Sequence, residues 1–158
     1  MNVEIEHKYL LKNTLYRDMA YKTTHIIQGY LSRDKQRTVR VRVKDDKACL
    51  TVKTCNKGDT RDEFEYIIPL SDAKALLKSC IPPIIEKTRF LVNFDGFVWE
   101  IDEFTGELNG IAIAEIELPS SDTHYTLPPF AGKNVTGNPL YYNSNIHLLA
   151  GGKSTQLQ

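Results

Sequence analysis

Charged residues of one sign recur at every second position along several short segments of this 158-residue chain. Residues 38–44 read Thr-Val-Arg-Val-Arg-Val-Lys, so valines alternate with Arg40 and Arg42. A period of two is typical of a β-strand, because successive side chains point to opposite faces. The pattern therefore predicts a chain built mainly from strands. The expected strands are 3–10, 25–32, 38–44, 48–54, 61–68, 86–93, 97–103 and 111–118.

The connections between these segments are short, and Asp95-Gly96 is typical of a two-residue hairpin turn. Short connections favour antiparallel pairing, because parallel strands need a crossover of a dozen or more residues. A few other segments show helical spacing or capping residues. We expect helices over 13–20, 71–80 and from Pro139 to about 149, a loop over 119–139, and a single domain over 1–158.

Like-charged pairs two residues apart mark six of the expected strands. The pairs are Glu4/Glu6, Arg40/Arg42, Glu63/Glu65, Lys87/Arg89, Glu100/Asp102 and Glu115/Glu117. In any one strand, such a face could simply meet water. Across all six strands together, repeated like charges are unfavourable unless groups of opposite sign lie between them. Closing the sheet supplies those groups and removes the exposed edges. We therefore predict a mainly β fold of the α+β type, an eight-stranded antiparallel β-barrel with a charged interior and a few flanking helices.

The interior of such a barrel would hold eight acids and six bases, a formal charge of −2. The acids are Glu4, Glu6, Glu63, Glu65, Glu100, Asp102, Glu115 and Glu117, and the bases are Lys8, Arg40, Arg42, Lys53, Lys87 and Arg89. Arginine and lysine suit a multiply charged phosphate anion. Carboxylates suit hard divalent cations such as Mg²⁺ or Mn²⁺. The combination indicates polyphosphate or triphosphate chemistry.

The overall charge is uninformative by comparison. The chain has 20 Lys and Arg residues against 20 Asp and Glu residues, a formal net charge of zero. A general nucleic-acid binder would carry a basic excess, and no apolar run approaches the roughly 18 residues of a membrane helix. Charged residues within the first ten positions interrupt any signal-peptide core. Three cysteines without a C-x-x-C motif are typical of free thiols. We expect a cytoplasmic protein without nucleic-acid or membrane partners.

The segment Glu4-Ile5-Glu6-His7-Lys8 resembles the E-x-E-x-K signature of the CYTH superfamily, the triphosphate tunnel metalloenzymes. The resemblance continues in order along nearly the whole chain. The further matching motifs are Gln28-Gly29-Tyr30-Leu31, Thr38-Val39-Arg40-Val41-Arg42, Thr51-Val52-Lys53, Glu63-Phe64-Glu65, Glu86-Lys87-Thr88-Arg89, Trp99-Glu100-Ile101-Asp102, Ala114-Glu115-Ile116-Glu117-Leu118 and Tyr141-Tyr142-Asn143. This family resemblance implies an eight-stranded antiparallel tunnel that binds a triphosphate together with metal.

The resemblance also implies roles for individual residues. The implied metal ligands are Glu4, Glu6, Asp102, Glu115 and Glu117. The implied phosphate-binding residues are Lys8, Arg40, Arg42, Lys53, Lys87 and Arg89. Together these eleven residues form the expected catalytic set. The residues Glu63, Glu65 and Glu100 are assigned only to the tunnel lining, where they would orient cations. The four histidines are expected to be structural, with His7 on the apolar face of its strand.

The chain is similar in size to the short bacterial members that act on inorganic triphosphate. We therefore expect a metal-dependent hydrolase of the terminal phosphoanhydride, with nucleoside triphosphates as further candidate substrates. Glu115, Glu117 or Asp102 would accept a proton. Two alternatives stay open: a class IV adenylyl cyclase that makes cyclic AMP from ATP, and a non-catalytic polyphosphate-binding module. The expected partner is a small triphosphate, and the expected assembly is a monomer or homodimer.

Overall fold

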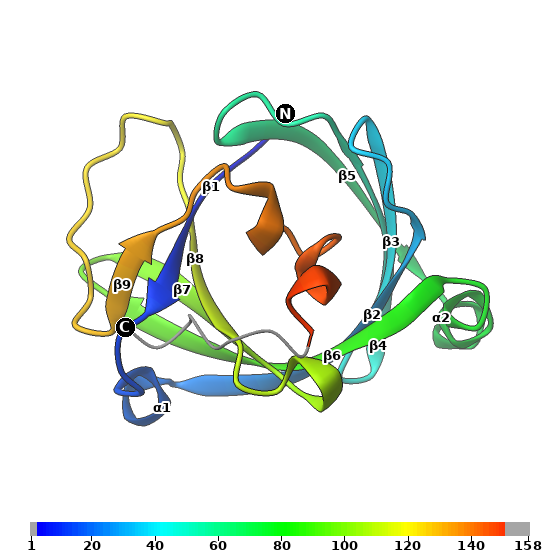
Figure 1. Ribbon diagram of the computed structural model, residues 1–158, viewed down its shortest axis with the longest axis horizontal. Helices are drawn as coiled ribbons and strands as arrows, with labels where there is room; N and C mark the ends of the chain where they lie inside the picture. Colours follow the sequence, from blue (N-terminus) through cyan, green and yellow to red (C-terminus); the bar gives the residue numbers. More distant parts are fainter. Residues whose placement is uncertain (1–2, 151–158) are drawn as a thin grey trace.

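Eight antiparallel strands form a closed ring in the computed structural model, which describes residues 3–150 (Figure 1). The order around the ring is β5-β4-β3-β2-β6-β7-β8-β1, and pairing between β1 and β5 closes it. A short ninth strand extends the sheet beside β1. The strands are β1 Val3–Leu11, β2 Lys22–Ser32, β3 Arg37–Lys44, β4 Lys47–Thr54, β5 Thr60–Ile68, β6 Ile81–Phe94, β7 Phe97–Phe104, β8 Ala112–Glu117 and β9 Ala131–Asn134. The predicted eight-stranded barrel is confirmed.

The helices are shorter than the sequence predicts. The α-helices are α1 Tyr16–Met19 and α2 Leu70–Leu77, and the 3₁₀ segments are η1 Gly106–Leu108, η2 Pro139–Tyr141 and η3 Ile146–Leu149. The expected helix over 71–80 ends early because Ile81 already pairs with Tyr30 in the β2–β6 ladder. The expected continuous C-terminal helix is wrong: the capping bond from the Leu140 amide to Asn138 forms, at 3.1 Å, but two separate 3₁₀ turns, η2 and η3, stand in its place. The poor helix formers of residues 142–145 explain this interruption.

Apolar side chains cover the outside of the barrel. Trp99, Ile101 and Ile116 form a buried cluster on the outer faces of β7 and β8, and Phe130, from the loop before β9, packs on them. Helix α2 covers the outer face of β3 and β4 on the opposite side of the ring (Figure 1). None of the helices within residues 3–150 has the length and apolar character needed to cross a membrane.

One glycine is required by close packing where β2 passes the start of β6. A Cβ atom at Gly29 would lie 2.7 Å from Cys80 Cβ and 2.9 Å from the end of Ile84. Side-chain carbons do not approach this closely, so only glycine fits without displacement of the neighbouring chain. The packing explains why a glycine interrupts the strand pattern after Gln28.

The interior of the barrel changes from charged to apolar along its axis. On β6, β7 and β8, the inward positions next to the charged residues are Ile85, Phe104 and Ile113. These side chains are buried together with Tyr30 and with Ile146 from η3. Figure 1 shows the C-terminal segment inside the ring of strands. One end of the barrel is therefore filled by apolar side chains, and the charged cavity opens toward the other end.

Candidate functional site

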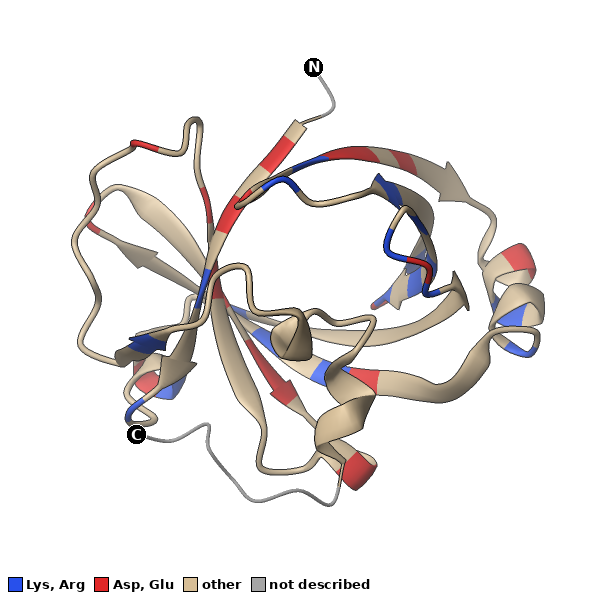
Figure 2. Ribbon diagram, turned by 45° about the horizontal axis from the view of Figure 1, so that its top comes forward, with Lys and Arg blue, Asp and Glu red and all other residues tan. Residues whose placement is uncertain are grey.

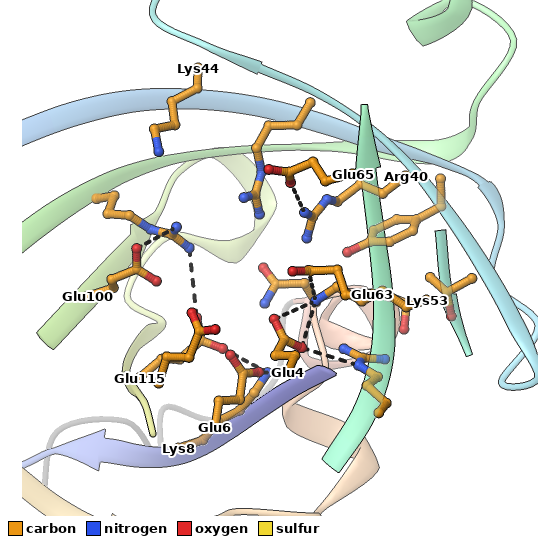
Figure 3. Close-up of a pocket in the computed structure, with 18 residues that line it drawn as sticks. Glu4, Glu6, Lys8, Arg40, Lys44, Lys53, Glu63, Glu65, Glu100 and Glu115 are labelled. Atoms are coloured by element: carbon orange, nitrogen blue, oxygen red, sulfur yellow. Dashed lines mark hydrogen bonds and ion pairs between the residues drawn. The ribbon is translucent and has the colours of Figure 1, made fainter. Parts of the chain in front are cut away.

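The charged inner face surrounds a cavity of about 200 Å³ (Figure 3). Its lining contains seven carboxylates and seven cationic groups, so its formal charge is zero rather than the −2 expected from the sequence. The carboxylates are Glu4, Glu6, Glu63, Glu65, Glu100, Glu115 and Glu117, and the cations are Lys8, Arg40, Arg42, Lys44, Lys53, Arg61 and Arg89. Figure 2 shows charges of both signs on the strands around this ring.

Three glutamates at the open side of the cavity, Glu63, Glu65 and Glu100, each pair with a more deeply buried cation. We call them the rim glutamates. The shortest ion-pair distances are 3.2 Å for Glu63 with Lys53, 3.7 Å for Glu65 with Arg40, and 3.2 Å for Glu100 with Arg89. Side-chain exposure is 26%, 48% and 38% for these glutamates, against 10%, 7% and 7% for their partners. An incoming anion can replace such water-exposed carboxylates at a lower free-energy cost than buried ones.

A buried ion cluster lies beneath the cavity floor. The Arg89 guanidinium donates to both oxygens of Asp102, at 2.7 and 2.9 Å, and Lys87 Nζ lies 2.7 Å from Asp102 Oδ2. Burial raises the pKa of Asp102, but Arg89 and Lys87 outweigh it and hold that pKa well below its usual range. Lys87 is fully buried, which lowers its pKa to about 7, and it also donates to Asn143 at 2.7 Å. Asp102 is thus fully engaged by cations.

Arg42 is a cation without an acidic partner among the described residues. Its Nε and Nη2 both donate to Gln28 Oε1, at 2.9 and 2.8 Å. Burial, followed by repulsion from Arg40 and Arg89, lowers the pKa of Arg42 to about 9. The guanidinium remains charged at neutral pH and has donors left for an anion in the cavity.

The opposite wall of the cavity is rich in carboxylates from β1 and β8. Glu6 pairs across the ladder with Glu117, and Lys8 with Glu115. Lys8 Nζ lies 3.0 Å from Glu115 and 3.6 Å from Glu6. Burial, followed by repulsion from Glu115, raises the pKa of Glu6 to about 8. Like charges placed opposite each other in a ladder are destabilising, so this wall would gain from a bound cation.

The remaining acid of this wall, Glu4, is held by two cations. Lys53 Nζ lies 3.1 Å from Glu4 Oε1, and Arg61 Nε lies 3.4 Å from it. Burial raises the pKa of Glu4, but Lys53 and Arg61 outweigh it and the pKa is lowered. Within residues 3–150, no three acidic, cysteine or histidine side chains meet in an arrangement ready to coordinate a metal. Glu4, Glu6 and Glu115 pair with lysine and arginine side chains instead.

A sequence model of the CYTH domain matches residues 2–138. The chain belongs to the CYTH family. It is 46% identical over 147 residues to the inorganic triphosphatase of Acetivibrio thermocellus, covering 92% of this chain and 94% of that protein. It is also 29% identical over 149 residues to the inorganic triphosphatase of Nitrosomonas europaea, covering 92% of this chain and 97% of that protein.

Solved structures of the CYTH fold superpose on the barrel. A crystal structure of an inorganic triphosphatase has a TM-score of 0.68 at 28% identity and covers 92% of this chain and 97% of its own. A Hippeastrum protein, described as an adenylyl cyclase with a dominant triphosphatase activity, has a TM-score of 0.55 at 15% identity over 76% of this chain and 80% of its own. The second likeness shows the shared fold alone.

The CYTH barrel brings twelve of the fourteen charged residues expected inside onto the cavity lining. The exceptions are Lys87 and Asp102, which lie on the inner face but in the buried cluster below. In this position Asp102 pairs with Arg89 and Lys87, and the metal-ligand role that the family resemblance implies for it stays a prediction.

The lining also contains charged residues that the sequence analysis missed, Lys44 and Arg61. Both continue a predicted charged face, two residues after Arg42 and two before Glu63, so the period of two could have identified them. Among the uncharged lining residues, Thr38 continues the face of Arg40 and Arg42, two residues earlier. Tyr30 and Asn143 lie in motifs of the family resemblance, and Ser144 carries no comparable signal. His7 lies outside the cavity, on the outer face, as expected, where it bonds to Asp59 and Tyr125.

Proposed function

We propose that this CYTH protein hydrolyses the terminal phosphoanhydride of inorganic triphosphate. The observation that carries the proposal is a closed-ended cavity whose cations face exchangeable carboxylates, with Arg42 lacking any acidic partner among residues 3–150. Such a cavity suits a small anion of high charge. The names of the relatives from A. thermocellus and N. europaea support the same activity.

Metal binding is part of this proposal, with Mg²⁺ or Mn²⁺ as the cation. The carboxylate wall fits a hard divalent ion, because Glu6 is crowded by Glu115 and Glu4 and takes up a proton when no cation is present. Glu4, Glu6 and Glu115 would hold the ion, with release of their lysine and arginine partners toward the substrate. A divalent ion supplies charge stabilisation on the phosphoryl group and acidifies the attacking water.

The protein's own groups would bind and orient the triphosphate. Arg40, Arg42, Lys53 and Arg89 neutralise its charge from one wall, which holds the chain in line for displacement. Asp102 and Lys87 keep Arg89 in place from below.

Of the three carboxylates expected to accept a proton, one is better suited to that role than the other two. Glu115 has a pKa lowered to about 2 because Lys8 and other cations outweigh its burial, and Asp102 is engaged by cations. Burial, followed by repulsion from Glu4, raises the pKa of Glu117, which makes no ion pair among the described residues. We assign proton acceptance to Glu117 and leave metal binding to the other acids of the wall.

The size of the cavity favours inorganic triphosphate over the cyclase alternative. Its volume of about 200 Å³ lies below the roughly 300–1,000 Å³ of pockets that enclose drug-sized ligands. A nucleoside would have to lie outside it, in the separate groove of about 470 Å³ beside Glu100 and Glu117. A module that only binds polyphosphate has no need for the carboxylate wall. The three cysteines are free thiols, which is consistent with the proposed cytoplasmic setting.

A substrate panel tests the proposal. Purified protein is incubated with inorganic triphosphate, ATP, thiamine triphosphate or long-chain polyphosphate, with Mg²⁺ or Mn²⁺, and the products are identified. Release of phosphate and pyrophosphate from inorganic triphosphate is expected. Cyclic AMP from ATP would replace the hydrolase with a cyclase, and binding without turnover would leave the polyphosphate-binding module.

Arg42→Ala tests the site within that panel. We expect loss of triphosphate turnover by at least about a hundredfold, because a charge-assisted contact to a transferred phosphoryl group is removed. The variant should stay folded, with a Tm change that reflects the two lost bonds to Gln28. Arg37→Ala is the matched control, since Arg37 lies on the same strand but pairs with Asp34 at the surface. Activity of Arg42→Ala close to that of Arg37→Ala would contradict the placement of the substrate in the cavity.

A further inference from the structure

A chain of hydrogen bonds lies on the outer face of β1, directly behind the carboxylate wall. His7 follows Glu6 and points away from the cavity. Its Nδ1 lies 2.6 Å from the Tyr125 hydroxyl, and its Nε2 lies 2.8 Å from Asp59 Oδ2. In the neutral ring, Nε2–H donates to Asp59 and Nδ1 accepts from Tyr125, so both ring nitrogens are satisfied. The residue joins two segments far apart in the sequence.

Both segments have further contacts at this point. Asp59 belongs to the connection between β4 and β5 and accepts a bond of 2.8 Å from Ser121. Tyr125 lies in the long loop before β9, and its hydroxyl is 2.6 Å from that of Tyr9. We call His7, Asp59, Tyr125, Tyr9 and Ser121 the outer clasp. Through His7 it fastens the β4–β5 connection to β1, and through His7 and Tyr9 it fastens the long loop to β1.

The outer clasp coincides with the weakest junction of the barrel. Strands β1 and β5 share three paired positions, whereas β1 and β8 share five. The last bond of the β1–β5 junction runs from the Glu6 amide to the Asp59 carbonyl, at 3.2 Å. The same residue, Asp59, therefore receives the Glu6 backbone and the His7 side chain. Glu4 and Arg61 face each other across this junction.

We propose that His7 is a positioning residue for the carboxylates of β1. The effect of this positioning on catalysis rests on the proposed function. By holding Asp59 against β1, His7 fixes the backbone from which Glu4 and Glu6 reach the cavity. Partners that orient a ligand side chain typically contribute about 10–100-fold to metal affinity or activity. Here the orientation is imposed through the backbone of the junction.

The position of the clasp predicts a selective effect. Arg40, Arg42 and Arg89 reach the cavity from β3 and β6, and no bond of the outer clasp involves these strands. Lys53 comes from β4 and pairs with Glu4, so it is coupled to the clasp through that glutamate. Loss of the clasp should therefore disturb the proposed metal-binding wall and leave the cations of β3 and β6 in place. A purely stabilising residue would affect both walls alike.

His7→Phe removes both bonds, His7→Gln keeps one donor and one acceptor, and Val92→Ala is a stability control in the outer apolar cluster. Hydrogen exchange of the Glu6 amide is measured without metal. The Mg²⁺ concentration for half-maximal turnover and the KM for triphosphate at saturating Mg²⁺ are measured separately. For His7→Phe we expect exchange of the Glu6 amide and the Mg²⁺ requirement to rise at least about tenfold, with KM changed less than about threefold and partial recovery in His7→Gln.

Unchanged exchange of the Glu6 amide in His7→Phe would overturn the clasp. Faster exchange with an unchanged Mg²⁺ requirement, or a profile equal to that of Val92→Ala, would overturn the positioning role. If the wild-type protein does not hydrolyse triphosphate, the proposed function fails. The exchange measurement still decides whether His7 holds the junction.

Discussion

Replacement of Asp102 by asparagine separates its role as a counter-ion from a role as a metal ligand. Asp102 accepts from Arg89 through both oxygens and pairs with Lys87 at 2.7 Å, and its side chain is 3% exposed. Asparagine has the same shape but turns an NH₂ group toward one of these donors in either orientation. Two buried cations then share no carboxylate in the cluster.

The magnitude follows from the burial of the cluster. Arg89 keeps Glu100 and Glu115, but Lys87 is left without a carboxylate partner among the described residues. Removing one partner of a buried ion pair costs about 3–5 kcal/mol, because the other charge, here that of Lys87, is left without compensation. For a domain of this size, each kcal/mol lowers Tm by about 2–4 °C, so Asp102→Asn should melt roughly 6–20 °C below wild type. Glu103→Gln, on the opposite face of β7, is the matched control. Its ion-pair partner Arg17 is 55% exposed, and a glutamine oxygen can still accept from the Tyr16 hydroxyl that bonds to Glu103, so we expect a cost of at most about 1 kcal/mol.

The assay is calorimetric melting at pH 6 in EDTA, below the pKa of about 7 of Lys87. The pKa of Asp102 is lowered, so its contribution is present above the unfolded pKa of about 3.9 and is lost only as pH falls below it. Adding inorganic triphosphate should raise the Tm of Asp102→Asn more than that of wild type, because the anion replaces the missing charge. A Tm within about 2 °C of wild type, or equal ligand shifts in both proteins, would refute the counter-ion role.

Three further outcomes are expected. Glu6→Gln should gain stability relative to wild type as pH rises from 5 to 8 without metal. Burial raises the pKa of Glu6 to about 8, so the folded wild type keeps a proton that the unfolded state releases above its ordinary pKa of 4.5. A pH-independent difference in Tm would contradict this. Gly29→Ala should lower Tm by roughly 2–12 °C through overpacking against Cys80, and an unchanged Tm would contradict the close contact. Glu65→Gln should lower the KM for triphosphate by up to about fivefold because Arg40 loses a competing partner, whereas a tenfold rise in KM would show that Glu65 binds metal or substrate.

The barrel could be predicted from the sequence because its strands obey one local rule. Alternation identifies the inner face of β3 from Arg40 and Arg42 alone, and the short turns set the antiparallel pairing. Structure that depends on distant contacts could not be predicted in this way. Strand β9 is four residues long and exists because it pairs with β1. The C-terminal segment lies inside the barrel, where Asn143 bonds to Lys87 and Gln28 and Ile146 joins the apolar filling. The local signal at Asn138-Pro139 predicted a continuous helix and not that path.

The candidate site shows the same division. The alternation of side chains along the strand predicts that Asp102 and Glu100 point inward, and both do. It does not state how far along the axis each lies from the apolar filling around Phe104 and Ile146. That depth decides that Asp102 is a buried counter-ion while Glu100 borders the open cavity. Depth depends on strand tilt and on the C-terminal segment, which are properties of the assembled barrel.

The neutral lining explains how a protein can keep so many cations ready for a polyanion. A cavity of unpaired cations would oppose folding, since each buried charge costs several kcal/mol without a partner. The barrel supplies partners at two depths. Asp102 is buried and holds Arg89 permanently, whereas Glu65, 48% exposed, pairs with Arg40 at 3.7 Å and can be displaced into water. Each displaced carboxylate exchanges one ion pair for another, so binding should strengthen with the number of phosphoryl groups that reach a cation. The rim glutamates would then favour triphosphate over its shorter products, which engage fewer of the three exchangeable pairs.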